Sequence, residues 1–261
     1  MRLFTDSTFW QGRLKAAGIH LAISLAVAAL AALLVFFVWY PYPYREISGG
    51  RELFLLVVAV DVVMGPLMTL AVFNLAKPRK ELRRDLAVIG LLQLAALVYG
   101  LWTVAVARPV HLVFEIDRFR VVHAIDVEPA LLKRVAPTLQ QLPFTGPTML
   151  SVREFKDSKE SFDATIAAMQ GFSLGSRPDL WQSYEKATAQ VIATAKPLAE
   201  LKARFPTRVQ EIDNVLKASS STATGQATIG YIPLASRSTF WTVLVNTKTA
   251  EVVGFLPIDP Y

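Results

Sequence analysis

Residues 19–40 read IHLAISLAVAALAALLVFFVWY, a run of 22 residues without Asp, Glu, Lys or Arg. An α-helix rises about 1.5 Å per residue, so about 20 apolar residues cross the ~30 Å hydrocarbon core of a bilayer. The run therefore predicts a membrane-spanning helix. Trp39 and Tyr40 stand at its end, where aromatic rings favour the headgroup level, and Pro41 and Pro43 should stop the helix.

Two further apolar runs, Leu53–Ala76 and Leu86–Ala107, contain 24 and 22 residues. Charged residues make up 18% of the 261-residue chain, against about a quarter in an average soluble domain. We therefore expect a membrane α-helical bundle of three transmembrane helices. A cleaved signal peptide is the alternative for the first run, but such apolar regions are about 7–15 residues long and close to the N-terminus. Since this run follows an 18-residue lead, we expect an uncleaved anchor.

Basic residues near the ends of the runs predict the orientation. The loop 77–85, KPRKELRRD, has five of them, the loop 41–52 has two, and the lead has three, namely Arg2, Arg13 and Lys15. Because cytoplasmic loops carry the excess of Lys and Arg, the N-terminus and the second loop are expected in the cytoplasm. The third crossing then delivers the remaining chain to the far side of the membrane, which in a Gram-negative cell is the periplasm. We expect a multi-pass membrane protein.

The chain is expected to consist of a membrane region, 1–107, and a periplasmic domain, 108–261. The net charge of +6 is mostly the topology signal, because the second part carries 17 basic and 15 acidic side chains. A nearly balanced domain gives no reason to expect a nucleic-acid partner. The lipid bilayer is the one partner that the composition itself predicts.

From Arg108 onward the pattern changes to that of a soluble α+β domain with an antiparallel sheet. Strands are predicted where β-branched and aromatic residues gather, at 109–116, 119–125, 148–155, 228–234, 240–246 and 250–257. Helices are predicted at 128–135, 157–170, 179–195, 197–204 and 207–218. In the second of these, Asp157 and Glu160 resemble a capping box, and Phe162, Ile166 and Met169 share one face. We expect helices against one face of the sheet.

The sequence offers little catalytic or metal-binding chemistry. With no cysteine there is no disulfide, thiolate metal site or Cys nucleophile. His111 and His123 lie in adjacent predicted strands and could bind a metal with Glu115 or Asp126, but no known ligand spacing is present. Ser219–Thr222 is expected to be a solvated loop, since no partner base is evident. We therefore expect no enzyme, no cofactor and no metal site.

Asp61, inside the second run, is the most informative single residue. An ionisable group in a span costs about 2.5–3.5 kcal/mol on insertion scales and usually faces protein or water. Tyr99 in the third run falls at a similar depth and could donate a hydrogen bond, while Gly65 and Pro66 could kink the second helix and free a carbonyl group. These four candidate contact residues either pack the three helices together or bind a partner helix. A proton-linked step at Asp61 is a further alternative.

Four segments together resemble a known family: LKAAGIHLAISL at 14–25, VDVVMGPLMTLAVFN at 60–74, DLAVIGLLQLAALVYGLW at 85–102 and ARPVHLVFEIDRF at 107–119. Their order and spacing are similar to those of the TfpX/TfpZ family of type IV pilin accessory proteins, over about the first 120 residues. The resemblance implies an inner-membrane protein that assists expression or assembly of its cognate major pilin. It implies no enzymatic activity and supplies no site residues.

The major type IV pilin is accordingly the expected partner, with other pilus assembly proteins as further ones. The resemblance implies a pilin with one hydrophobic helix and a periplasmic head. The helices of this chain could contact the former and residues 108–261 the latter. Close helix approach is favoured by small residues of the first run: Ala26, Ala28, Ala29, Ala31 and Ala32.

Two other functions remain as alternatives. A membrane-anchored sensor would bind a ligand with its periplasmic domain, although the loop 77–85 leaves little room for an output domain. A small transporter is less favoured, because three spans and one acidic group provide a poor pathway without oligomerisation.

Overall fold

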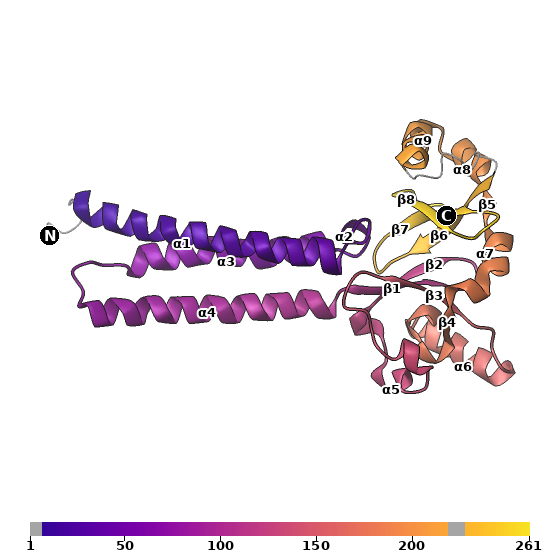
Figure 1. The fold of residues 1–261 in the computed structure, drawn as a ribbon, viewed down its shortest axis with the longest axis horizontal. Coiled ribbons are helices and arrows are strands. Elements are labelled where there is room, and N and C mark those ends of the chain that lie inside the picture. The colour runs from indigo at the N-terminus through magenta and orange to yellow at the C-terminus, as the bar shows by residue number, and fades with distance from the viewer. Residues whose placement is uncertain (1–6, 219–227) are drawn as a thin grey trace. The chain divides into compact units, whose positions relative to one another are not determined.

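A computed structural model describes residues 7–218 and 228–261 and divides into two units (Figure 1). The first unit runs to Arg45 and resumes from Gly49 to Val106. The second contains Glu46–Ser48 and Ala107–Tyr261. Arg2 of the orientation argument and the predicted loop Ser219–Thr222 lie outside the described residues.

The first unit is built from three long helices. They are α1 (Ser7–Leu33), which continues as a π-helix (Leu34–Trp39), α3 (Gly50–Val72) and α4 (Arg79–Val106), with the short α2 (Tyr44–Ile47) between the first two. Three segments are long and apolar enough to cross a membrane: Trp10–Trp39, Gly50–Val72 and Arg79–Val106. The prediction of three transmembrane helices is thus confirmed. Helix α3 ends at Val72, before the end of the apolar run Leu53–Ala76. The side chain of Asn74 accepts a hydrogen bond from the Ala76 amide, and this contact favours a turn.

Helix α3 is the central one: it packs against both α1 and α4, which make little contact with each other. At one end of the unit, the Tyr40 ring is fully buried and its hydroxyl donates a hydrogen bond of 3.0 Å to the Val104 carbonyl. Val104 lies in the last turn of α4, where carbonyls have no partner within the helix. Trp39 is also buried. The two aromatic residues therefore pack inside the unit, and their location at the headgroup level stays a prediction.

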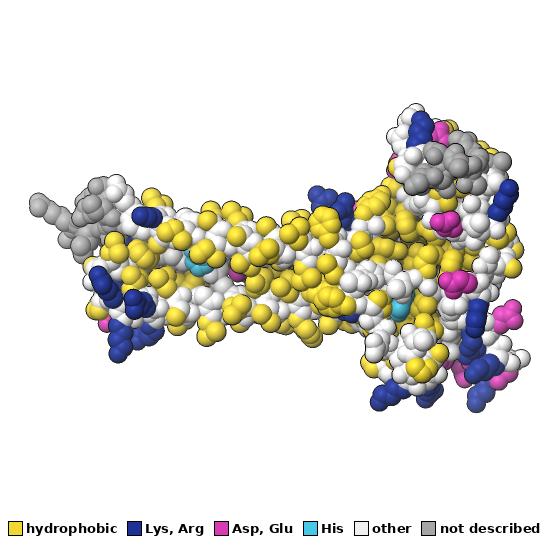
Figure 2. All heavy atoms as spheres, viewed as in Figure 1, with side chains coloured by type: hydrophobic (Ala, Val, Ile, Leu, Met, Phe, Trp, Pro, Cys, Tyr) yellow, Lys and Arg dark blue, Asp and Glu magenta, His cyan; other side chains and the backbone are white. Residues whose placement is uncertain are grey.

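The outer surface of the first unit is largely apolar. Figure 2 shows hydrophobic side chains over the three helices and a group of Lys and Arg where α1 and α4 begin. Leu30, Phe37 and Leu91 are each more than two-thirds exposed, at 67%, 74% and 67%. An apolar surface of this extent suits contact with lipid. In water, the same surface would cause a protein to aggregate.

The second unit contains one mixed sheet. Its strands are β1 (Pro109–Phe114), β2 (Phe119–His123), β3 (Thr148–Val152), β4 (Trp181–Ser183), β5 (Lys196–Pro197), β6 (Ile229–Ala235), β7 (Phe240–Asn246) and β8 (Val252–Leu256). They lie in the order β4-β3-β1-β2-β6-β7-β8, with β5 paired to β6. The predicted β1–β2 hairpin is present. The sheet is not wholly antiparallel as predicted, because β1 pairs with β3, and β2 with β6, in parallel.

The central strands are buried on both faces. Every residue of β1 and of β6 is buried, which differs from the expected sheet with helices against one face only. Parallel pairings are usually covered on both faces, and their strands then read as continuous apolar runs. The sequences PVHLVF and IGYIPLA have this character, since neither alternates between apolar and polar residues.

The helices of the second unit are short. They are α5 (Pro129–Leu132), α6 (Ser158–Met169), α7 (Thr188–Thr194), α8 (Leu198–Arg204) and α9 (Val209–Ala218). The predicted helix at 179–195 is wrong in its first half, because strand β4 occupies 181–183 and pairs Trp181 with Val152 of β3. Pairing with an existing strand outweighs a weak local helix propensity.

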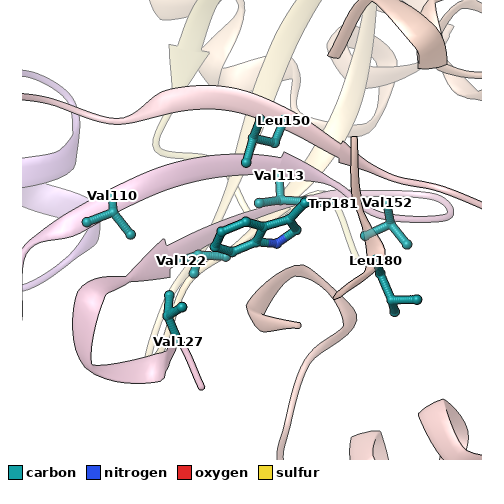
Figure 3. Close-up of a cluster of buried hydrophobic side chains, with 8 residues drawn as sticks. All are labelled: Val110, Val113, Val122, Val127, Leu150, Val152, Leu180 and Trp181. Carbon is teal, nitrogen blue, oxygen red and sulfur yellow. The ribbon is translucent and has the colours of Figure 1, made fainter. Parts of the chain in front are cut away.

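Two apolar cores hold this unit together. One lies against β6, β7 and β8 and includes Leu201 and Ile212 from α8 and α9. The other lies at the β1–β4 end, and Figure 3 shows its eight side chains, with the indole ring of Trp181 among them. The Trp181 Nε1 donates a 2.7 Å hydrogen bond to the Gly175 carbonyl, so the ring is buried without an unpaired donor.

Candidate functional site

Asp61 is the central residue of α3, with eleven residues of the helix on either side. In a helix that crosses a bilayer this position lies near the midplane, where an acidic group is most costly. Its partner is Gln93 of α4, whose Nε2 lies 3.3 Å from Asp61 Oδ1 and 3.1 Å from the Asp61 carbonyl oxygen. These two contacts use both N–H groups of the amide. Within the described residues, no donor bonds to the second carboxylate oxygen, Oδ2.

Gly65 leaves the space that the Gln93 amide occupies, and Pro66 follows it in α3. A Cβ atom added to Gly65 would lie 1.8 Å from Gln93 Nε2, so any larger residue at 65 would displace the amide. Pro66 has no N–H, which removes the hydrogen bond to the Val62 carbonyl and loosens the ladder one residue away from Asp61. Gln93 binds the carbonyl of Asp61, the residue before Val62. The structure thus brings two of the four predicted contact residues, Asp61 and Gly65, against a glutamine that the sequence analysis did not single out, and Pro66 follows Gly65 in α3.

Tyr99, the fourth predicted residue, does not bond to Asp61. Its side chain is 68% exposed, and its ring lies 5.9 Å from that of Trp102. The Tyr99 carbonyl accepts a 2.9 Å hydrogen bond from Thr103. Tyr99 nevertheless borders the same groove as Asp61, so the similar depth expected from the sequence is consistent with the structure.

A groove of about 270 Å³ runs between α3 and α4. Apart from Asp61, Tyr99 and Thr103, its lining is apolar or glycine: Leu53, Leu56, Val57, Val60, Ala96, Leu97, Gly100 and Val104. On α3 the lining extends from Leu53 to Asp61, which is about 12 Å or two helical turns. The groove therefore presents a largely apolar wall with one carboxylate at its inner end.

Gly100 sets the close approach of the two helices. A Cβ added there would lie 2.5 Å from Val57 Cγ1, and the β-branched valine has little freedom to move away. We expect Gly100→Val to lower the stability of the first unit by about 1–3 kcal/mol, the usual range for overpacking. Thermal unfolding in detergent measures the change.

Gly90→Val is the matched control on the same helix, because a Cβ at Gly90 meets nothing within 4 Å. Equal destabilisation by the two substitutions would show that helix propensity, and not the contact with Val57, accounts for the effect.

A second polar contact joins α1 to α3. His20 Nδ1 lies 2.5 Å from Thr69 Oγ1, and Ser24, one turn further along α1, is buried. Of the small residues of the first run, Ala31 is buried and Ala28 and Ala32 are half-buried. These residues therefore serve contacts inside the unit.

Helix α6 of the second unit exposes an apolar stripe. The exposed fractions of Phe162, Ile166 and Met169 are 64%, 39% and 80%, and Phe172 beyond the helix is 56% exposed. The three helix residues share a face, as the sequence predicts, but the buried residue of α6 is Ala164. The predicted capping box is formed in part: Asp157 Oδ1 accepts from the Glu160 amide at 2.8 Å, but the Glu160 carboxylate accepts from the Lys156 amide, not that of Asp157, and pairs with Arg153 at 2.7 Å. Polar contacts thus fix the helix and leave its apolar stripe free.

The two histidines of the hairpin face opposite sides of the sheet. His111 pairs with Val122 across the hairpin, and successive side chains of a strand alternate, so His123 projects the other way. His111 Nδ1 lies 2.8 Å from Thr148 Oγ1, whereas His123 Nδ1 lies 3.2 Å from Asp126. The two histidines, which the sequence analysis considered as a pair of metal ligands without expecting a site, are therefore not brought together. Across 7–218 and 228–261, no three His, Asp or Glu side chains gather as metal ligands would.

A polar cavity of about 450 Å³ lies beside Asp126 in the second unit. Burial raises the pKa of Asp126, but hydrogen bonds from His123 and Arg237 outweigh this and lower it to about 2. The other arginine of the cavity, Arg120, bonds to Glu115 at 3.0 Å. Both cations are thus already matched by carboxylates, and the cavity has no excess positive charge for an anion.

Comparison with known proteins points to one kind of protein. The family described as fimbrial assembly protein FimB matches residues 8–49. The chain is 36% identical to the fimbrial assembly protein of serogroup I of Dichelobacter nodosus and 35% identical to that of serogroup E1, in each case over 248 residues and 95% of both chains. A third relative from this organism, the fimbrial assembly protein of serogroups C1 and C2, is 46% identical over 113 residues, 43% of this chain and 86% of its own. Among solved structures, none matches.

Proposed function

Because the chain belongs to the family of fimbrial assembly proteins, we propose that it is an inner-membrane accessory protein of type IV pilus biogenesis that binds the cognate major pilin before or during assembly. The observation that carries the proposal is the similarity over 95% of both chains, which includes the membrane helices and the second unit alike. A role in pilus biogenesis follows from these relatives. The relatives do not extend to pilin binding or to membership of the narrower TfpX/TfpZ family, and these two statements are our proposal.

Two surfaces support binding of a membrane-anchored subunit. The apolar first unit can meet a hydrophobic helix within the bilayer, and the α6 stripe of Phe162, Ile166 and Met169 can meet a soluble head. Exposed apolar patches of this kind mark interaction sites in proteins. The basic loop 77–85 supports a cytoplasmic N-terminus and a periplasmic second unit. A reporter fused after Tyr261 should accordingly be active in the periplasm.

Deletion of the gene should remove surface pili while pilin transcription continues. In detergent extracts, the full-length protein should retain the major pilin on affinity purification. Normal piliation of the deletion strain together with absence of pilin from the purified material would refute the proposal.

The α6 stripe provides a sharper test. We expect the double substitution Phe162→Ser and Met169→Ser to lower the amount of co-purified pilin about tenfold, since removal of two large interface side chains costs at least about 1 kcal/mol in binding. Ala168→Ser, on an exposed position of the same helix, is the control and should leave the amount unchanged. Equal amounts of pilin with all three proteins would exclude the stripe as the contact.

A ligand-binding sensor is the second candidate, and the polar cavity beside Asp126 is the observation that favours it. The loop 77–85 is nine residues long, which leaves no room for a folded output domain between α3 and α4. A sensor would therefore need a separate signalling partner. Normal pilin stability but altered pilin transcription in the deletion strain would favour this function.

A further inference from the structure

We propose that the groove between α3 and α4 seats the membrane helix of the client pilin, and that Asp61 Oδ2 accepts a hydrogen bond from a donor on that helix. The inference rests on the proposed function and deepens it, because it names the seat and the chemistry of the contact. The occupant is one apolar helix that carries an N–H or O–H donor level with Asp61.

The first step of the argument is the unequal state of the two carboxylate oxygens. Gln93 Nε2 is directed to Asp61 Oδ1 and to the Asp61 carbonyl, so its donors are used. In the part of the chain that the structure describes, Oδ2 has no such bond. At the depth of the α3 midpoint an acidic group faces protein or water and not lipid, and the apolar lining of the groove beside Asp61 favours a protein partner.

The second step is the shape of the wall around that oxygen. The groove is lined by Leu53, Leu56, Val57 and Val60 on one side and by residues of α4 on the other. Its length on α3, about two helical turns, matches the contact that one further helix makes when it packs beside a pair. Gly65 and Gly100 hold the wall in this shape through their contacts with Gln93 and Val57.

The third step separates a helix from the other possible occupants. A lipid acyl chain can fill an apolar groove but has no donor for Oδ2. A second copy related by a two-fold axis through the groove would place groove against groove, so neither groove would receive a helix. A partner helix with a donor satisfies both the apolar wall and the carboxylate.

The chain contains no cysteine, so single-cysteine variants of the full-length protein can be crosslinked in native membranes. Leu56→Cys is placed in the groove. Leu55→Cys is its neighbour on α3, is also more than half exposed and does not line the groove. Cysteines are scanned along the hydrophobic helix of the cognate major pilin. We expect Leu56→Cys to form disulfides with one face of the pilin helix, about tenfold more than Leu55→Cys, because a disulfide requires Cα atoms within about 7 Å.

Substitutions at Asp61 test the hydrogen bond. Asp61→Leu in the Leu56→Cys background should lower crosslinking about three- to tenfold, the range for one hydrogen bond between membrane helices. Asp61→Asn, of the same shape, should lower surface piliation more than it lowers the abundance of the protein. Equal loss of piliation and abundance would assign Asp61 to internal packing and overturn the proposed contact.

Three other outcomes would show that the groove does not bind the pilin helix. They are equal crosslinking at positions 55 and 56, disulfide-linked dimers of this chain through position 56, and adducts with lipid alone from a photoreactive probe at position 56. Failure at 56 while wild-type protein still retains pilin leaves the proposed function intact and refutes only the groove. Absence of pilin from wild-type material together with normal piliation after deletion refutes both.

Discussion

Replacing Trp181 with alanine is expected to lower the free energy of unfolding of the second unit by about 3–5 kcal/mol, the usual cost of removing a buried aromatic side chain. The indole is 5% exposed and lies among Val113, Val122 and Leu150, and its Nε1 ties β4 to the Gly175 carbonyl. Domains of this size are stable by only about 5–15 kcal/mol, so the loss is a large part of the total. Pulse proteolysis of the detergent-solubilised full chain across a denaturant series measures the change.

Trp181→Phe and Phe162→Ala serve as the two controls. Phenylalanine keeps most of the apolar contact but cannot donate the hydrogen bond to Gly175, so it should fall between the wild type and Trp181→Ala. Phe162 is 64% exposed, and its truncation should change stability by less than about 0.5 kcal/mol. A loss below about 1 kcal/mol for Trp181→Ala would mean that the core of Figure 3 does not hold the unit together.

The membrane helices could be predicted from the sequence because length and composition alone specify them. A run of 22 uncharged residues such as 19–40 has no other stable arrangement in lipid than a helix, whatever its neighbours do. The second unit was predicted less completely. Residues 181–183 form a strand because they pair with β3, and the local sequence contains no pattern that predicts this contact. The burial of both sheet faces, by contrast, could have been found in the non-alternating sequences of β1 and β6.

The candidate site was partly predictable for a similar reason. The high cost of a carboxylate in a span identified Asp61 directly, but the choice between Tyr99 and Gln93 as its partner depends on how α3 and α4 are rotated. Gly65 was the available signal, because a glycine one turn after Asp61 opens the space that a side chain from another helix can enter. The apolar stripe of α6 was predicted as a face, whereas its exposure follows from tertiary packing.

The two candidate surfaces differ in chemistry, and this difference restricts the partner. The groove of the first unit combines apolar side chains with one carboxylate, while the α6 stripe of the second unit is purely apolar. If the partner contacted only the stripe, Asp61→Asn would not change the amount of complex. If it contacted only the groove, Phe162→Ser would not change that amount. Sensitivity to both indicates a client with a membrane helix and a soluble head, which is the kind of partner that we propose.

A pH-dependent loss of stability is expected from His111. Burial lowers the pKa of His111, and the hydrogen bond to Thr148 only partly opposes this, so the value falls from 6.5 to about 4. Because the folded pKa lies below the unfolded one, the unfolded state binds more protons between these values. The contribution of neutral His111 is therefore complete above pH 6.5 and disappears as the pH falls toward 4. The full difference corresponds to about 3 kcal/mol, of which about 2 kcal/mol is removed by about pH 5.

His111→Phe should remove this dependence while it preserves the packing. The imidazole lies edge-on to Trp181 at a centroid distance of 4.6 Å, and its Nε2 is among the buried atoms without a hydrogen-bond partner in the described chain. A phenyl ring can therefore take its place, and the substitution removes only the hydrogen bond to Thr148. Denaturant unfolding at about pH 7 and pH 5 should show a drop of about 2 kcal/mol for the wild type and a much smaller drop for the variant. Asp126, with a pKa of about 2, titrates below this range, so an equal drop in both proteins would assign the pH sensitivity to groups other than His111.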